Sequence, residues 1–101
     1  MPVLMLCVRV KVRILGVLSL TKDQDYINLD LDEDATISTV MHKIINMITS
    51  ARREIWDNVV DSPVPNALIL LNGVEINNLE GLSTKVRGGS EIVIIPVTHG
   101  G

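Results

Sequence analysis

The sequence predicts an α+β fold in which one main helix covers a single mixed β-sheet. Two observations predict it: five short segments rich in alternating or β-branched apolar residues, and one longer segment whose apolar residues recur at helical spacing. With 101 residues, 47% of them hydrophobic, the chain has the size and composition of one small globular domain. Phe is absent and the only aromatic residues are Tyr26 and Trp56, so the core must be aliphatic.

The first two predicted strands form an antiparallel hairpin. From Val8 to Ile14, valine and isoleucine alternate strictly with basic residues, which predicts one apolar and one basic face. The apolar side chains are expected to point inward, and the basic ones to point to solvent: Arg9, Lys11 and Arg13. The segment from Tyr26 to Leu31 alternates in the same way, and residues 15–25 form the expected connection.

The longer segment predicts the helix. Three acidic residues, 32–34, precede it where the helix dipole favours negative charge, and Thr36 is the expected N-cap. The apolar positions at helical spacing are Ile37, Val40, Met41, Ile44, Ile48 and Ala51. The helix is expected to extend through Arg53 and Trp56, and the two prolines within 62–66 predict a loop after it.

Three further strands are predicted after this loop. Ala67 to Leu71 is followed by an Asn72-Gly73 turn and a short strand over 74–76, and the last strand runs from Glu91 to Ile95. A second turn, with positive φ, is expected at Gly88-Gly89. The order is therefore β-β-α-β-β-β, with the last strand returning beside the first and the helix on one face of the sheet. This order is that of the β-grasp, or ubiquitin-like, architecture.

Two of these strands, 67–71 and 92–95, are apolar on both faces. Since one helix covers only one face, alternate residues are expected to form an exposed partner-binding surface. The pattern alone allows either set of alternate residues to be exposed: Leu68 and Leu70 or Ile69 and Leu71, and Ile92 and Ile94 or Val93 and Ile95. We assign partner binding to one set, bordered by Arg9 and Lys11: Ile69, Leu71, Ile92 and Ile94. The alternatives are a covered central strand, a homodimer contact, and a merely solvated basic stripe.

Charge and cysteine content narrow the class of function. A net charge of −3 gives no reason to expect direct nucleic-acid or membrane binding, and no apolar stretch is long enough to span a bilayer. The single cysteine, Cys7, allows no internal disulfide, so a reducing, cytoplasmic location is expected, with Cys7 packed as a small apolar residue. His42, expected on the polar helix face, and His99 are too far apart to suggest a metal site, and no phosphate-binding glycine motif occurs.

The segment from Leu68 to Gly101 resembles the ubiquitin-like sulphur carriers. That family includes the molybdopterin synthase small subunit, the thiamine-pathway carrier, the ubiquitin-related modifier and the small archaeal modifiers. The shared features are the Asn72-Gly73 turn, a final strand over 89–96 that ends in proline, and the terminal Gly100-Gly101. The ending His99-Gly100-Gly101 is most similar to the ubiquitin-related modifier, whereas the turn and Pro96 are more similar to the synthase subunit. Ser90 stands where the family usually has an acidic residue.

The resemblance implies a β-grasp domain over 1–96 and a flexible tail over 97–101. It implies that an E1-like enzyme uses ATP to adenylate the carboxylate of Gly101, while His99 and Gly100 thread a narrow channel of that enzyme. A side chain at either glycine would clash there, and φ must be free. The chain itself would be a carrier and not an enzyme, with no bound cofactor.

The adenylate would then become a thiocarboxylate, for sulphur transfer as in tRNA thiolation, or a thioester, for conjugation to lysines of target proteins. The partners implied are the E1-like enzyme and a sulphur-acceptor enzyme or target protein. The alternative is the small, sulphur-carrying subunit of molybdopterin synthase, whose large subunit would be the partner. A third reading is a ubiquitin-like binding domain with an inert tail.

Overall fold

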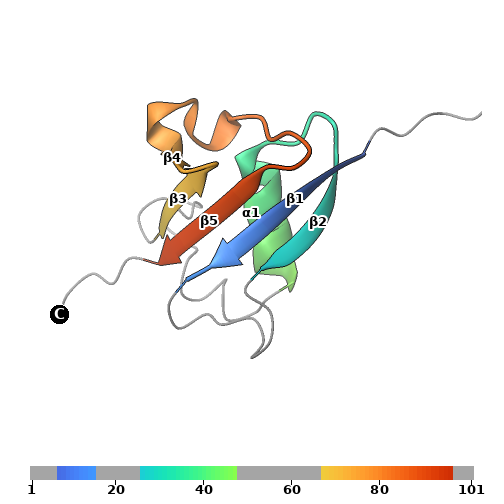
Figure 1. Ribbon diagram of the computed structural model, residues 1–101, viewed down its shortest axis with the longest axis horizontal. Coiled ribbons are helices and arrows are strands. Elements are labelled where there is room, and N and C mark those ends of the chain that lie inside the picture. The colour runs from blue at the N-terminus through green and yellow to red at the C-terminus, as the bar shows by residue number, and fades with distance from the viewer. Residues whose placement is uncertain (1–6, 16–25, 48–66, 97–101) are drawn as a thin grey trace, which may run out of the picture.

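The computed structural model describes residues 7–15, 26–47 and 67–96, and these form one sheet with a helix against it (Figure 1). The strands are β1 (Cys7–Ile14), β2 (Ile27–Asp32), β3 (Ala67–Leu71), β4 (Val74–Glu75) and β5 (Glu91–Pro96). The helix is α1 (Ile37–Met47), and two 3₁₀ turns, η2 (Ile76–Asn78) and η3 (Gly81–Ser83), lie between β4 and β5. The strand order in the sheet is β2-β1-β5-β3-β4.

The sheet is mixed, as the sequence predicted. β1 and β2 pair antiparallel, with Val10 opposite Leu29, because alternation on both strands places their apolar residues on the same face. β5 lies parallel to β1 and antiparallel to β3, so the last strand returns beside the first and occupies the centre of the sheet. The five-stranded mixed sheet with one main helix is the β-grasp fold.

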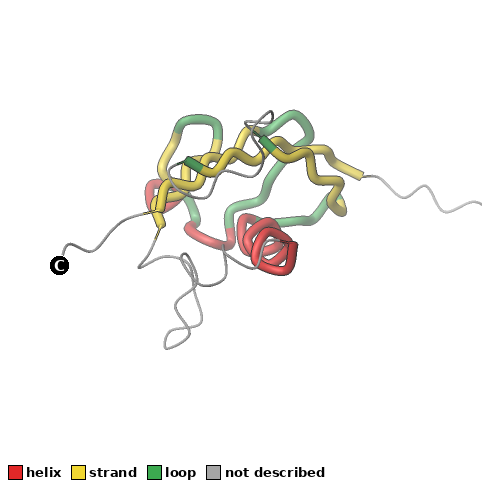
Figure 2. Tube along the Cα trace, turned by 90° about the horizontal axis from the view of Figure 1, so that it is seen from below, coloured by secondary structure: helices red, strands yellow, loops and turns green. Residues whose placement is uncertain are grey.

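Helix α1 lies across one face of the sheet (Figure 2). Thr36 caps it: the Thr36 hydroxyl accepts from the amide of Thr39 at 3.4 Å, and the Thr39 hydroxyl accepts from the amide of Thr36 at 3.2 Å. The apolar stripe then turns toward the sheet, because residues three and four positions apart share a helix face. The buried residues of α1 are Ile37, Val40, Met41, Ile44 and Ile45. The predicted continuation of the helix, with Ile48, Ala51, Arg53 and Trp56, lies outside the described residues.

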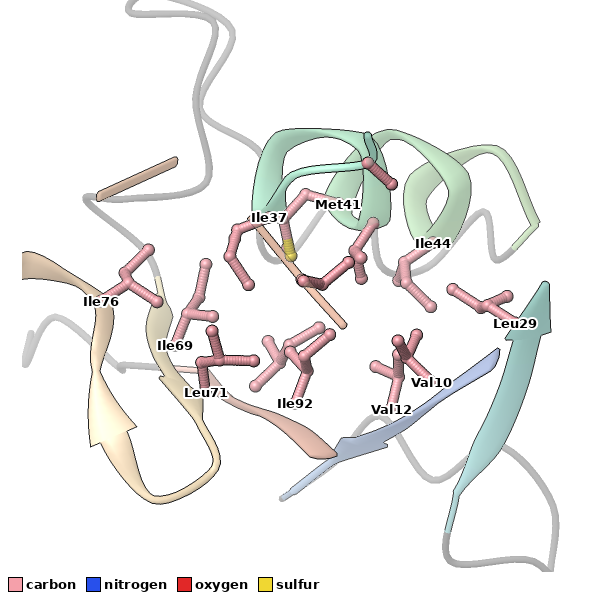
Figure 3. Close-up of a cluster of buried hydrophobic side chains, with 14 of the residues drawn as sticks. Val10, Val12, Leu29, Ile37, Met41, Ile44, Ile69, Leu71, Ile76 and Ile92 are labelled. Carbon is pink, nitrogen blue, oxygen red and sulfur yellow. The ribbon is translucent and has the colours of Figure 1, made fainter. Parts of the chain in front are cut away.

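The core lies between α1 and the sheet and is aliphatic (Figure 3). Met41 and Ile44 point down onto side chains of β1 and β5, among them Val10, Val12 and Ile92, each 0% exposed. The segment after η3 closes one end of the core, since the amide of Ile37 donates to the Thr84 carbonyl and Val86 is 2% exposed. The helix is therefore held against the sheet by apolar packing, and backbone hydrogen bonds join its start to the segment after η3.

Two tight turns take the conformations that their residues favour. Asn72 and Gly73 both have positive φ, 49° and 85°, which is the hairpin turn that Asn-Gly predicts. The Asn72 side chain also accepts from the amide of Glu91 at 2.8 Å, which fixes the turn against β5. At the second turn only Gly89 has positive φ, 85°, and the buried Ser90 hydroxyl accepts from the amide of Arg87 at 3.2 Å.

Our assignment of the partner-binding residues on β3 and β5 is wrong. The assigned side chains are between 0% and 8% exposed and pack beneath α1: Ile69, Leu71, Ile92 and Ile94. The other alternate residues point away from the helix: Leu68, Leu70, Val93 and Ile95. Periodicity could not choose between the sets because both are fully apolar. The register with β1 decides it, since Ile92 pairs with the inward-facing Val12.

Two expectations about β1 are also corrected. Cys7, expected to pack as a small apolar residue, is exposed at the start of the strand. Arg13 points away from the helix as expected, but its side chain is half-buried instead of free in solvent. Arg9 and Lys11 are exposed, as the alternation predicted. None of the helices in the described part of the chain is long and apolar enough to cross a lipid bilayer.

Candidate functional site: the outer face of the sheet

We call the sheet face opposite α1 the outer face. The alternation of each strand places on it the side chains that the core does not use. Its composition changes across the strand order, so that the part over β2 and β1 is charged and the part over β5 and β3 is apolar except for Glu91 at the start of β5. These two parts are called the polar half and the apolar half.

The polar half is organised by side-chain pairs. Arg9 and Asp30 face each other across β1 and β2, and the guanidinium donates twice to the carboxylate, Nε to Oδ1 at 2.8 Å and Nη2 to Oδ2 at 3.2 Å. The hydrogen bond from Arg9 lowers the pKa of Asp30, and the same bond raises the pKa of Arg9. Lys11 places its ammonium 4.9 Å from the centre of the Tyr26 ring and lies beside Glu91 in the register. Arg9 and Lys11, the two basic residues assigned to the border of the partner-binding surface, therefore each contact another side chain of this chain.

The apolar half consists of four side chains in two cross-strand pairs. Leu68 lies opposite Ile95, and Leu70 lies opposite Val93. Leu68 is 37% exposed and the other three are half-buried, although α1 covers only the opposite face. Leu15, also 37% exposed, adjoins this group, because its amide donates to the carbonyl of Ile94 at the end of β1. A contiguous apolar surface of this kind is typical of a protein–protein contact.

The apolar half adjoins the end of β5. Ile95 is the penultimate residue of the strand, and Pro96 still pairs with Ala67. Residues 97–101 follow next in the sequence, and they include the predicted tail residues His99, Gly100 and Gly101, which lie outside the described residues. The patch is therefore next to the point at which the chain leaves the sheet, and sequence reasoning missed this because it chose the wrong alternate residues.

The described residues contain no group of three or more His, Cys, Asp or Glu side chains placed to hold a metal ion. His42 is exposed on α1, where Nδ1 lies 2.8 Å from the Ser38 carbonyl. An open cleft of about 370 Å³ lies at the other end of β5 from Pro96, with Asn72, Lys85 and Arg87 among its lining residues. Its lining includes none of the apolar-half residues, so the outer face is the better candidate site.

Comparison with known proteins assigns the fold to a class. No protein-family model matches the sequence, and no curated protein matches it. Solved structures do match, and they are those of ubiquitin-like β-grasp proteins. The fold of this chain is thus the ubiquitin-like β-grasp fold.

Three of these structures are similar over nearly the whole chain. Small archaeal modifier protein 1 from Methanosarcina acetivorans has a TM-score of 0.77 at 24% identity, covering 94% of this chain and 98% of its own. Urm1 from Trypanosoma brucei has a TM-score of 0.73 at 17% identity, covering 94% and 97%. A Pyrococcus furiosus protein described as molybdopterin converting factor subunit 1 has a TM-score of 0.69 at 17% identity, covering 90% and 99%. At these identities the likeness establishes the shared fold.

Proposed function

We propose that this chain is a ubiquitin-like sulphur carrier and protein modifier, activated at the carboxylate of Gly101 by an E1-like, ATP-dependent enzyme. The observation that carries the proposal is the apolar half of the outer face, set beside the end of the strand that leads to Gly100-Gly101. The fold supports it, because two of the similar structures are a small archaeal modifier and Urm1.

The proposed chemistry needs little from the chain beyond its carboxylate. A carboxylate oxygen of Gly101 attacks the α-phosphate of ATP, and pyrophosphate leaves, which gives an acyl-adenylate. Hydrosulphide then attacks the acyl carbon, AMP leaves and the thioacid loses its proton, which gives a thiocarboxylate for sulphur transfer, as in tRNA thiolation. Attack by a cysteine thiolate gives a thioester instead, and a lysine amine of a target protein then displaces that thiol to form an isopeptide bond.

The contribution of the chain to these steps is positioning. β5 is hydrogen-bonded on both edges, to β1 and to β3, so the point at which the tail begins is fixed relative to the apolar half. An enzyme that docks on Leu68 and Ile95 holds residues 97–101 within reach of its nucleotide site. Two glycines without side chains suit a narrow channel, and this is the role proposed for Gly100 and Gly101.

The experiment compares an N-terminally tagged chain, expressed in its own host, with a variant that lacks Gly101. A ladder of larger bands on a denaturing, reducing blot that disappears with Gly101 supports conjugation. Because Arg87 is the last site for trypsin, modified lysines should carry the branch 88–101. The intact mass of the free chain tests for Gly101 as the last residue and for the exchange of one oxygen for sulphur. If neither ladder nor thiocarboxylate is found, the proposal is refuted.

A second candidate is the small subunit of molybdopterin synthase. The similarity to the Pyrococcus furiosus protein described as molybdopterin converting factor subunit 1 favours it. In that role the apolar half and the tail would engage a large catalytic subunit instead of many target proteins. A stable stoichiometric complex with one large protein in a native pull-down, with a thiocarboxylate but no ladder, would select this function.

A further inference from the structure

Arg13 lies at the boundary between the polar and apolar halves of the outer face. In the register it pairs with Val93, which in turn lies opposite Leu70, so the Arg13 side chain adjoins the apolar half. Its Nε is buried and has no hydrogen-bond partner among the described residues. An arginine that buries its stem and leaves a donor unpaired loses hydration without compensation.

Two carboxylates of its own face, those of Asp30 and Glu75, accept hydrogen bonds from other residues. Asp30 accepts both hydrogen bonds from Arg9, and Glu75, opposite Leu70, accepts from the backbone and side chain of Asn77. Glu91 lies beside Lys11, two register positions from Arg13, and Asp32 lies opposite Cys7 at the far end of β1. Within the described part of the chain, no ion pair joins Arg13 to any of these carboxylates, and its strand neighbour is Val93 of the apolar half.

We propose that the protein that docks on the apolar half presents a carboxylate to Arg13. The inference deepens the proposed function, since it rests on docking by the E1-like enzyme and specifies the chemistry of that enzyme's surface: apolar, with one acidic side chain. A guanidinium pairs with a carboxylate through two parallel hydrogen bonds, and such a pair gains strength where apolar contacts exclude water. A carboxylate brought to this position by docking supplies the partner that the Arg13 guanidinium lacks in the free chain.

The charge of Arg13 makes the proposed docking surface selective among apolar partners. Leucine, isoleucine and valine side chains accept many apolar partners, whereas a charge beside them rejects partners that bring a like charge or none. The polar half adds little discrimination, because Arg9 already has a carboxylate and Lys11 already contacts Tyr26. Arg13 is therefore the residue of this face that is expected to select the partner.

The test measures ATP–pyrophosphate exchange by the purified E1-like enzyme of the same host, with the chain as its substrate. The variants are Arg13→Met, which keeps the apolar stem, Arg13→Lys, which keeps the charge, and Lys11→Met, a control that removes one charge from the polar half. The expected rise in KM for Arg13→Met is about thirtyfold or more with kcat unchanged, as for the loss of one member of a buried charge pair. Arg13→Lys should lie between, and Lys11→Met should stay within about threefold of the wild type.

The dependence of KM on ionic strength distinguishes the loss of a charge pair from the loss of shape complementarity. The KM of the wild-type chain should rise with ionic strength, and the slope should be smaller for Arg13→Met because the pair is gone. The melting temperature of Arg13→Met should equal or exceed that of the wild type, since an unpaired buried donor has been removed.

Several results would overturn the inference. An unchanged KM for Arg13→Met refutes it while leaving the proposed function intact, provided that the wild type supports exchange. If Lys11→Met raised KM as much as Arg13→Met, the net charge of the face would explain the effect. If the KM of the wild type and of Arg13→Met rose equally with ionic strength, shape complementarity would explain it. A dimer in sedimentation that Arg13→Met dissociates would assign the face to a second copy of the chain. If the wild type supports no exchange, the proposed activation by this enzyme fails, and the inference fails with it.

Discussion

Ile94 and Ile95 are adjacent residues of the same type on opposite faces of β5, and they allow a matched test of which face is the core. Ile94 is 0% exposed beneath α1, and Ile95 is half-buried on the outer face opposite Leu68. Truncation of Ile94 to alanine removes three carbon groups, or about 2.4 kcal/mol of transfer free energy at about 0.8 kcal/mol for each. The enclosed cavity adds to this loss, so the expected cost is about 3–4 kcal/mol.

The same truncation of Ile95 should cost about 1 kcal/mol, because its side chain is already partly in water and no enclosed cavity forms. For a domain of this size, about 1 kcal/mol corresponds to roughly 4–8 °C in melting temperature. Ile94→Ala should therefore melt at least about 12 °C below the wild type, and Ile95→Ala should melt within about 8 °C of it.

The assay is thermal and urea unfolding followed by far-ultraviolet circular dichroism, with both variants at the same concentration and pH. In the exchange assay, Ile95→Ala should raise the KM for the chain although the fold is nearly intact. If Ile95→Ala lost as much stability as Ile94→Ala, the outer face would be a second core and the docking argument would be refuted.

Three further predictions concern the frame of the fold. Gly89→Ala, at φ 85°, should lower the free energy of unfolding by about 1 kcal/mol or more. Gly88→Ala, whose added Cβ meets only Val8 Cβ at 3.9 Å, should change it by no more than about 0.5 kcal/mol. The midpoints of urea unfolding compare the two variants. Thr36→Ala removes the N-cap of α1 and should cost about 1 kcal/mol by the same measurement. Because Arg9 lowers the pKa of Asp30, their pair stabilises the fold above the ordinary aspartate pKa of 3.8, and this contribution is lost as the pH falls through the lowered value. The free energy of unfolding of Asp30→Asn should therefore fall less steeply with decreasing pH than that of the wild type. Identical pH profiles for the two proteins would contradict this prediction.

The sequence predicted the order of the elements because the apolar residues of the strands and of the helix recur with different periods. Alternation in 8–14 specified β1 and its inward face, and the Asn72-Gly73 turn fixed the β3–β4 hairpin. The predicted strand over 67–71 agrees with β3 to the residue, and the last strand extends one residue beyond its predicted end, to Pro96. The short strand over 74–76 ends earlier than predicted, because Ile76 turns inward to the core and begins η2.

The candidate site could be predicted only in part. The sequence located a doubly apolar pair of strands, but the choice of face depends on long-range register, which a local pattern does not contain. The side chain of Arg13 shows the same limit, since alternation gives its direction but not that Val93 and Leu70 lie alongside it. The roles assigned to His99, Gly100 and Gly101 stay predictions, since these residues lie outside the described part of the chain.

β5 links the three parts of the proposed function through one backbone. Its inward residues, Ile92 and Ile94, are held under α1, and its outward residues, Val93 and Ile95, are two of the four side chains of the apolar half. Because the side-chain period of a strand is two, burial of one set fixes the other set on the opposite face. Hydrogen bonds to β1 and β3 on both edges prevent β5 from sliding, so the stability of the core sets the position of the surface and the starting point of the tail. In the proposed function the carboxylate of Gly101 is the reactive group, and its specificity depends on where the strand before the tail is held.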